Sequence, residues 1–516
     1  MTIELNQLNY GDYQTPLEFA NKVCMILKND LGVVPNTIIE PTCGEGNFIK
    51  ASLDVFDNIN LVYGVEIQEG YYIKTKEKFK ENRNVKIVQD NIFTHNFSDI
   101  KCNNILIIGN PPWVTNSALG MADLGNLPKK RNFKGFKGLD AITGKGNFDI
   151  AEYIIIQMIT EFKNHTGYIA MLCKNIVVKN ILQHIHNYDF KIGDMRMYNF
   201  SAKEVFNASC EASLFVAKLG IEKEYTCKIY DINNSNVLLS TIGWVGDKFV
   251  SDVESYRDYM FVDTNVNSNI FEWRQGIKHD CSKVMEFLMS NNKIINGFGE
   301  EFEINEDIED TYIYGLLKSS DMKKFQISDC RKCVMVTQKK VKEETKQIQC
   351  LAPKTWKYLK KYEHLLDARK SSIYKNSPKF SIFGVGEYSF KSYKVAISGM
   401  YKKPQFTLVC PVDDKPVMLD DTCYFLGFDN YEEALITCAL LNSKPVQNFL
   451  RAVAFIDNKR PYTKDILMRI NIIEVAKHLT FDEIIKILEI NRIENINITE
   501  MNYTDFKVKY SELTFL

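Results

Sequence analysis

The chain has 516 residues, of which 45% are hydrophobic, and a formal net charge of −1. This length predicts two or more domains, and the hydrophobic content is ordinary for globular proteins with sizeable cores. The chain does not start with a charged segment followed by a long apolar core, and no later apolar run approaches the roughly 18 residues of a membrane span. These features exclude a membrane protein and favour an unprocessed cytoplasmic one.

The thirteen cysteines are scattered singly, in an odd number and without framework spacing. This distribution suits reduced thiols and excludes a secreted disulfide scaffold. Cys330 and Cys333 form a CxxC pair, but no second pair follows at the spacing of a zinc ribbon. We therefore expect no metal site.

The first 220 residues alternate short runs rich in Val and Ile with segments of helical periodicity. The runs predict strands at residues 37–40, 61–66, 85–89, 104–109 and 167–173. Helical patterns cover residues 17–29, 68–82 and 149–162. This alternation predicts an α/β fold with a doubly wound, mostly parallel sheet, in which ligands bind beyond the carboxyl ends of the strands.

Three of these predicted strands end on acidic residues. Glu40 precedes a turn with Gly44 and Gly46, which allow close approach of a ligand to the backbone. Glu66 ends the second strand, where a carboxylate can bind both hydroxyls of a ribose, and Asp90 ends the third. This order favours an adenosine-containing cofactor. The dinucleotide pattern GxGxxG is absent, because residue 49 is Ile.

The fourth strand ends in Asn110-Pro111-Pro112-Trp113, a sequence that can continue neither a ladder nor a helix. The Asn110 side-chain oxygen and the Pro111 carbonyl can accept both hydrogens of an exocyclic amine. The prolines would fix these acceptors in place before the reaction. Trp113 would offer a flat face to a base taken out of its stack. The alternative is a proline-terminated strand with a core Trp.

Several segments in this order resemble the motifs of the γ-class, amino-group DNA methyltransferases. They are GDYQTP (11–16), EPTCGEGNF (40–48), YGVE (63–66), QDNIF (89–93), GNPPW (109–113), GNFDIAEYII (146–155) and VFNASCEASLFVAKL (205–219). The resemblance covers about the first 220 residues. It implies a Rossmann-like methyltransferase fold, S-adenosyl-L-methionine as cofactor, and an adenine flipped out of duplex DNA as substrate.

The resemblance also implies roles for individual residues. The cofactor-binding residues would be Thr15, Glu40, Cys43, Gly44, Gly46, Glu66, Asp90, Asn91, Ile92 and Pro112. The target adenine would contact Asn110, Pro111, Trp113 and a second aromatic residue, Phe206. Trp113 departs from the family, in which Tyr or Phe is more usual, but stacking survives that change.

A glycine-rich segment with a basic run follows the NPPW turn, at residues 113–146. A long loop in a compact domain is usually functional or disordered. We expect a mobile lid over DNA that includes Lys129, Lys130 and Arg131, with a plain disordered insertion as the alternative.

The second half of the chain is expected to bind DNA. Between Lys318 and Lys403, 21 Lys or Arg stand against 7 Asp or Glu, a net charge of +14 interleaved with aromatic residues. Such asymmetry is typical of a surface that meets polyanions, although a merely solvated face is the alternative. The predicted DNA-binding residues here are Lys391, Lys394, Lys402, Lys403, Lys459 and Arg460.

The sequence thus predicts a catalytic domain at residues 1–235 and a mixed α+β target-recognition domain at residues 236–516. The predicted activity is adenine-N6 methylation by a monomer on double-stranded DNA, in a restriction–modification system with a separate endonuclease encoded nearby.

Three alternatives stay open. They are a methyltransferase acting on RNA or on protein glutamine, a bifunctional endonuclease-methyltransferase, and a non-catalytic DNA-binding module. The bifunctional enzyme is disfavoured, because QTP begins at residue 14 and no paired-carboxylate and Lys nuclease site stands out in the second half.

Overall fold

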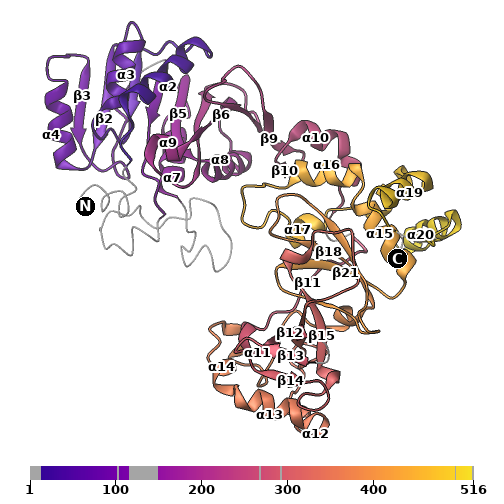
Figure 1. Cartoon of the computed structure of the whole chain (residues 1–516). Coiled ribbons are helices and arrows are strands. Elements are labelled where there is room, and N and C mark those ends of the chain that lie inside the picture. Colours follow the sequence, from indigo (N-terminus) through magenta and orange to yellow (C-terminus); the bar gives the residue numbers. More distant parts are fainter. Residues whose placement is uncertain are drawn as a thin grey trace. The chain divides into compact units, whose positions relative to one another are not determined.

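The computed structural model describes residues 13–100, 104–115, 149–265, 269–290, 293–493 and 496–513. The chain divides into two compact units between Glu254 and Ser255 (Figure 1). This division comes later than the one predicted after residue 235, because β9 (Ser240–Val245) and β10 (Lys248–Val250) extend the sheet of the first unit. None of the described helices is long and apolar enough to cross a membrane.

The first unit is built on one ten-stranded sheet in the order β10-β9-β8-β6-β7-β5-β4-β1-β2-β3. Its first eight strands along the chain are β1 (Thr37–Glu40), β2 (Leu61–Glu66), β3 (Val85–Gln89), β4 (Ile105–Gly109), β5 (Gly167–Lys174), β6 (Ile192–Ser201), β7 (Glu211–Leu219) and β8 (Thr226–Asp231). Strands β3, β2, β1, β4 and β5 are parallel, and β7 runs antiparallel between β5 and β6. The predicted doubly wound α/β fold is confirmed.

The helices of this unit lie among the strands along the chain, starting with α2 before β1. They are α2 (Leu17–Asn29), α3 (Asn47–Val55), α4 (Glu69–Lys78), α7 (Ile150–Glu161), α8 (Asn175–Asn187) and the short α9 (Ala202–Phe206). Every side chain of β1 and β4 is buried, so both faces of the sheet are covered at its centre. Helix α2 buries one apolar stripe at helical spacing, which includes Ala20, Val23 and Leu27.

The second unit contains two smaller sheets and a group of helices, as the predicted mixed α+β class requires. The five-stranded sheet has the order β11 (Arg274–Gln275), β21 (Cys423–Phe428), β18 (Tyr393–Ser398), β19 (Phe406–Val409), β16 (Gln326–Ile327). The six-stranded sheet has the order β14 (Glu301–Glu303), β13 (Lys293–Asn296), β12 (Glu286–Ser290), β17 (Lys332–Met335), β15 (Ile313–Leu317), β20 (Met418–Leu419).

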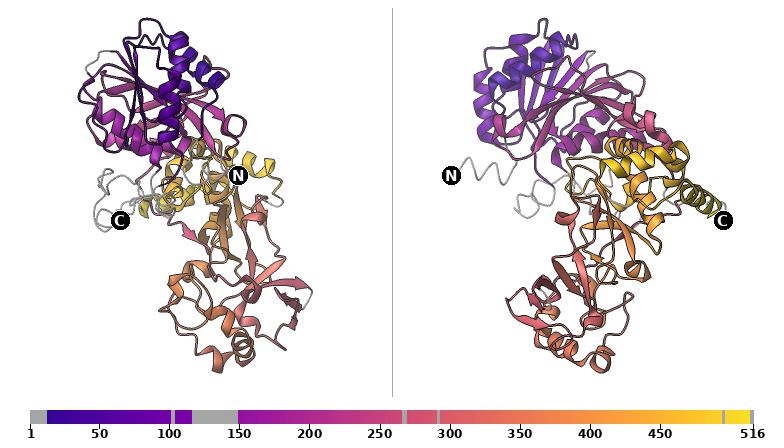
Figure 2. Two further views of the ribbon diagram at one scale, coloured as in Figure 1. Left: turned by 90° about the vertical axis from the view of Figure 1, so that its left-hand side faces the viewer. Right: turned by 45° about the vertical axis from the view of Figure 1, so that its right-hand side comes forward.

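Helices α15 (Tyr431–Leu441), α19 (Phe481–Ile490) and α20 (Glu500–Leu513) gather at one end of this unit, and the six-stranded sheet lies at the other (Figures 1 and 2). The segment after β21 forms two consecutive helices, α15 and α16 (Lys444–Val453). The break falls at Asn442 and Ser443, because Pro445 fits only the first turn of a new helix.

Candidate active site

A cavity of about 300 Å³ lies at the carboxyl ends of the parallel strands. Its walls come from the ends of β1, β2, β3 and β4, from the segment before α2, and from α7. Nine of the ten predicted cofactor-binding residues line it, and so does Asn110: Thr15, Glu40, Cys43, Gly44, Glu66, Asp90, Asn91, Ile92 and Pro112. The ends of the parallel strands therefore bring together residues that are far apart in the sequence, as expected for this kind of sheet.

The two glycines of the turn after β1, Gly44 and Gly46, have different structural roles. Gly44 adopts φ +48°, and a Cβ atom there would lie 2.5 Å from Oε1 of Gln14, so the close approach at the cavity wall requires glycine. Gly46 does not line the cavity. It takes φ +70° at the start of α3, where a Cβ would lie 2.8 Å from Cγ2 of Thr75 on α4. Its role in this structure is to shape the turn.

The carboxylates of Glu66 and Glu40 lie in different environments. Glu66 accepts hydrogen bonds from the backbone N–H of Gly44 at 2.8 Å and of Gln68 at 2.7 Å, which fixes its orientation. Oε2 of Glu40 is buried without a hydrogen-bond partner among the described residues. Burial raises the pKa of Glu40 well above its ordinary value, and the nearby charge of Glu66 raises it further.

Asp90 stands at the more open end of the cavity, with 46% of its side chain exposed. One carboxylate oxygen accepts from the Asn91 backbone N–H at 2.7 Å, and the other contacts Nδ1 of His95 at 2.6 Å. The hydrogen bond with His95 lowers the pKa of Asp90 below its ordinary value. The carboxylate keeps lone pairs for a further donor.

Asn110 follows the last residue of β4, and its amide is held in one orientation. Nδ2 donates to the carbonyl of Tyr13 at 2.7 Å. Because that carbonyl can only accept, the amide nitrogen must face it, which leaves the oxygen on the other side. Oδ1 of Asn110 is buried and has no partner within the described part of the chain. Pro112 lines the cavity beside Asn110, whereas Pro111 is buried and is not among the lining residues.

The aromatic residues predicted to hold the target base pack against each other. Trp113 is 5% and Phe206 6% exposed, and their ring centroids lie 5.2 Å apart in an edge-on arrangement. The Tyr13 ring contacts both, at 5.7 and 6.0 Å. The prediction of an open stacking face on Trp113 is wrong for this conformation, because Tyr13 and Phe206 already cover the indole.

A partly buried ion pair between Lys174 and Asp149 connects the end of the NPPW turn to the sheet. Nζ of Lys174, the last residue of β5, donates to the carbonyl of Trp113 at 2.9 Å and to Oδ2 of Asp149 at 2.8 Å. Asp149 is 8% exposed and also accepts from the N–H of Ala151, where it caps α7. The carbonyl that follows the prolines is thereby fixed by a charge-assisted hydrogen bond.

The predicted DNA-binding residues lie in different environments, and their role in DNA binding stays a prediction. Lys129, Lys130 and Arg131 lie outside the described residues. Lys402, Lys403 and Lys459 are exposed, Lys391 pairs with Asp429, and Arg460 donates to the carbonyl of Asp421 at 3.3 Å.

The prediction for Lys394 is wrong, because this side chain is 1% exposed and donates to the Lys391 carbonyl. Burial lowers the pKa of Lys394 to about 7.

Sequence reasoning missed part of the cavity wall. Tyr13 and Gln14 directly precede Thr15. Ile67 and Phe93 come after the ends of β2 and β3, and Ile150 begins α7. Ile67 is 43% exposed, which is unusual for an isoleucine directly after a buried strand. An apolar residue directly after a polar strand end, such as Ile67 after Glu66, could have predicted this part of the cavity wall from the sequence. Within the described part of the chain, no group of three His, Cys, Asp or Glu side chains could hold a metal ion.

The chain is strongly similar in sequence to a known type II methyltransferase. The type II methyltransferase M.NspV of Nostoc sp. (strain ATCC 29411 / PCC 7524) is 44% identical over 481 residues, which cover 92% of this chain and 98% of that protein. No family model matches the chain.

Similarity to solved structures is low. The methyltransferase subunit of a type I restriction-modification system from Streptococcus thermophilus aligns with a TM-score of 0.32 and 14% identity, covering 45% of this chain and 50% of that one. A dimethyladenosine transferase from Plasmodium falciparum gives 0.27 and 12%, covering 40% of this chain and 63% of that one. These similarities carry no argument about activity. On the sequence identity along nearly its whole length, the chain belongs to the family of type II methyltransferases.

Proposed function

We propose that the protein is a γ-class DNA methyltransferase that modifies the N6 atom of adenine in a restriction–modification system. It transfers a methyl group from S-adenosyl-L-methionine to an adenine flipped out of duplex DNA. The observation that carries this proposal is Asn110, which lines the cavity and whose fixed amide leaves Oδ1 without a partner among the described residues.

The cavity residues fit this methyl donor. Four residues that line it have a buried polar atom without a partner among the described residues: Thr15 Oγ1, Glu40 Oε2, Thr42 Oγ1 and Asn110 Oδ1. Buried polar atoms are normally hydrogen-bonded, so this set indicates a polar ligand. Thr15 and Glu40 would hold the methionine part, Glu66 the ribose, and Asp90 with its apolar neighbours the adenine.

The reaction would depend on positioned acceptors. When bound, the donor supplies an electrophilic methyl group on a sulfonium. Asn110 and the Pro111 carbonyl would accept the two hydrogens of the target amine, which moves electron density onto the attacking nitrogen. The Tyr13 carbonyl holds the Asn110 amide ready for this task. The proton leaves after the nitrogen becomes cationic, so no strong general base is needed.

Entry of the target base would require the aromatic cluster to open. Stacked rings lie roughly 3.5 Å apart, so a base between two rings needs about 7 Å between them. Trp113 and Phe206 lie edge-on at 5.2 Å, with Tyr13 against both. We infer that Tyr13 withdraws when the base enters and that Trp113 and Phe206 then form the walls of the base site.

Duplex DNA is the proposed substrate because the second unit carries the basic segment from Lys318 to Lys403. The enzyme would act as a monomer and would protect DNA against a separate endonuclease.

The test is methyl transfer from labelled donor to duplex DNA, RNA and protein by wild type and Asn110→Ala. Wild type is expected to label DNA, and the variant to bind the donor but lose transfer by orders of magnitude. Unaltered turnover by Asn110→Ala, or labelling of RNA or protein instead of DNA, would contradict the proposal.

A further inference from the structure

A basic groove of about 490 Å³ lies in the second unit, between residues of its two sheets. Five cationic residues line it: Lys318, Lys323, Lys324, Arg331 and Lys332. Only two acidic residues line it, Asp321 and Asp329. The groove therefore gathers five cations of the basic segment in one recess. None of the predicted DNA-binding residues lies in it.

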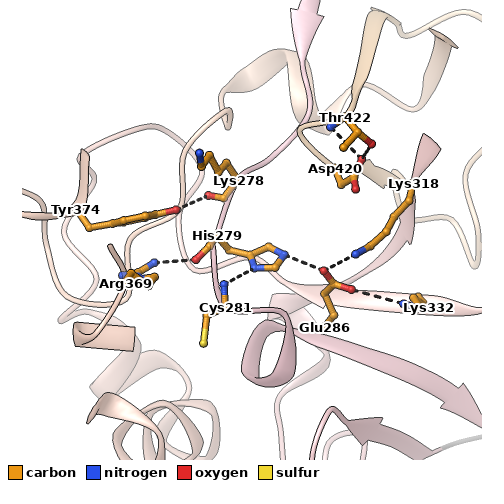
Figure 3. A network of polar contacts seen from close by, with 10 residues as sticks. All are labelled: Lys278, His279, Cys281, Glu286, Lys318, Lys332, Arg369, Tyr374, Asp420 and Thr422. Carbon is orange, nitrogen blue, oxygen red and sulfur yellow. Dashed lines mark hydrogen bonds and ion pairs between the residues drawn. The ribbon is translucent and has the colours of Figure 1, made fainter. Parts of the chain in front are cut away.

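A buried carboxylate, Glu286, lies beside two lysines of this groove, Lys318 and Lys332 (Figure 3). The Glu286 side chain is 9% exposed and lies 2.6 Å from Nζ of Lys318 and 3.7 Å from Nζ of Lys332. On its other side it contacts Nε2 of His279 at 3.3 Å. One carboxylate thus fixes two lysines of the groove, and the pair of ammonium groups keeps an excess of positive charge.

The outer side of the groove carries cations that are open to solvent. Lys323 and Lys324 are exposed, and no ion pair to either is found among the described residues. The Arg331 side chain is 87% exposed and reaches Asp321 only at 3.4 Å. Leu288, which is 52% exposed, adds an apolar surface to the same recess. Ammonium groups around an apolar patch suit phosphates with their sugars better than a small anion.

We propose that this groove binds the phosphate backbone of duplex DNA and sets the position of the second unit on the substrate. Lys323 and Lys324 contact phosphates directly, and Glu286 is a positioning residue that holds Lys318 and Lys332 toward them. This inference rests on the proposed function, because it takes DNA as the substrate. Each phosphate contact releases condensed counterions. The groove contacts should therefore contribute measurably to the decrease of DNA affinity with salt concentration.

The test compares wild type with Lys323→Ala/Lys324→Ala, using a fluorescein-labelled mixed-sequence DNA duplex and fluorescence anisotropy over a salt series. The matched control is Lys444→Ala/Lys486→Ala, which removes two charges from exposed lysines of the same unit outside both the groove and the basic segment. The groove variant is expected to raise the Kd about tenfold and to reduce the slope of log K against log salt by about 1.8, at about 0.9 per contact. The control is expected to keep both values.

Two outcomes would overturn the inference. One is a groove variant with the Kd and salt slope of wild type, and the other is an equal loss in the control variant. An unchanged thermal unfolding midpoint shows that the groove variant is folded. Methyl transfer by wild type to DNA is measured alongside, so an enzyme that methylates DNA without using the groove is distinguished from one that does not act on DNA.

Discussion

At the scale of single residues, the chemistry of the candidate active site depends on which polar atoms already have hydrogen-bond partners. Asn110 has a satisfied amide nitrogen and an unsatisfied oxygen, and Glu40 has one unsatisfied carboxylate oxygen. A buried polar group without a partner costs stability, and a polar ligand in the cavity would remove that cost by supplying the missing contact. The sequence placed both residues at strand ends but could not show the orientation of the Asn110 amide, which depends on the carbonyl of Tyr13.

Glu40 provides a pH-dependent prediction. Its pKa is raised by burial and by the charge of Glu66, so the free protein holds a proton there above the ordinary range. A cationic methyl donor would lower that pKa and release the proton. Donor affinity should therefore rise with pH between the pKa of the complex and that of the free protein.

Calorimetry in two buffers with different ionisation heats measures this release. Glu40→Gln, which has no proton to lose, is the control and should remove the buffer dependence. Buffer-independent heats for wild type would contradict the assignment.

The wrong prediction for Lys394 shows what charge alone cannot reveal. Lys394 lies on β18, at the centre of the five-stranded sheet, and every residue from Lys394 to Ser398 is buried. A strand covered on both faces has no solvent side, so its lysine passes through the core to a backbone carbonyl. Trp113 was misplaced for a similar reason, because its cover comes from the distant Tyr13 and Phe206.

At the scale of elements, hydrophobic runs and their polar ends predicted β1 to β5 well. Each is a short Val- and Ile-rich run with a defined end, and the parallel arrangement puts those ends at one edge. The contacts that fix the NPPW turn were not visible, because Lys174 and Asp149 belong to different elements.

Replacing Lys174 should separate positioning from binding. Lys174→Met leaves the Trp113 carbonyl without its donor and Asp149 without its cation. Because small misplacements of a reacting group are costly, the single-turnover transfer rate should fall about 10- to 100-fold while the donor Kd stays the same. Lys174→Arg keeps the charge and should recover part of the rate. An unchanged rate in Lys174→Met would show that the ion pair does not position the turn.

The network around Glu286 gives a prediction about stability. Burial alone would raise the pKa of Glu286, but hydrogen bonds from His279 and Lys318 lower it from its ordinary value to about 2. A lowered carboxylate pKa stabilises the folded state above the unfolded pKa, and this stability is lost as the pH falls toward 2. The contribution is about 3 kcal/mol at about 1.4 kcal/mol per pH unit.

Urea unfolding of wild type and Glu286→Gln between about pH 2 and pH 5 measures this contribution. The difference between their free energies of unfolding should shrink as the pH falls. A difference that does not change with pH would contradict the ion-pair network.

At the scale of the whole molecule, the net charge of −1 concealed an uneven distribution. The positive excess of the second half is concentrated between Lys318 and Lys403, and the five cations of the groove all lie in the first part of this segment, between Lys318 and Lys332. The class of each unit could be predicted from periodicity, whereas the boundary was placed too early because β9 and β10 add antiparallel strands to the first sheet. Which lysines share a groove depends on the pairing of short strands, which composition does not encode.

We propose above that Asn110, whose amide is fixed at the end of β4, directs methylation to the amino group of adenine in DNA. The most direct measurement of this proposal is modified-base sequencing of DNA from cells that express wild type or Asn110→Ala. Wild type should leave N6-methyladenine at one defined sequence, and the variant should leave none. Methylation at cytosine, no methylated base with wild type, or an unchanged pattern with Asn110→Ala would contradict it.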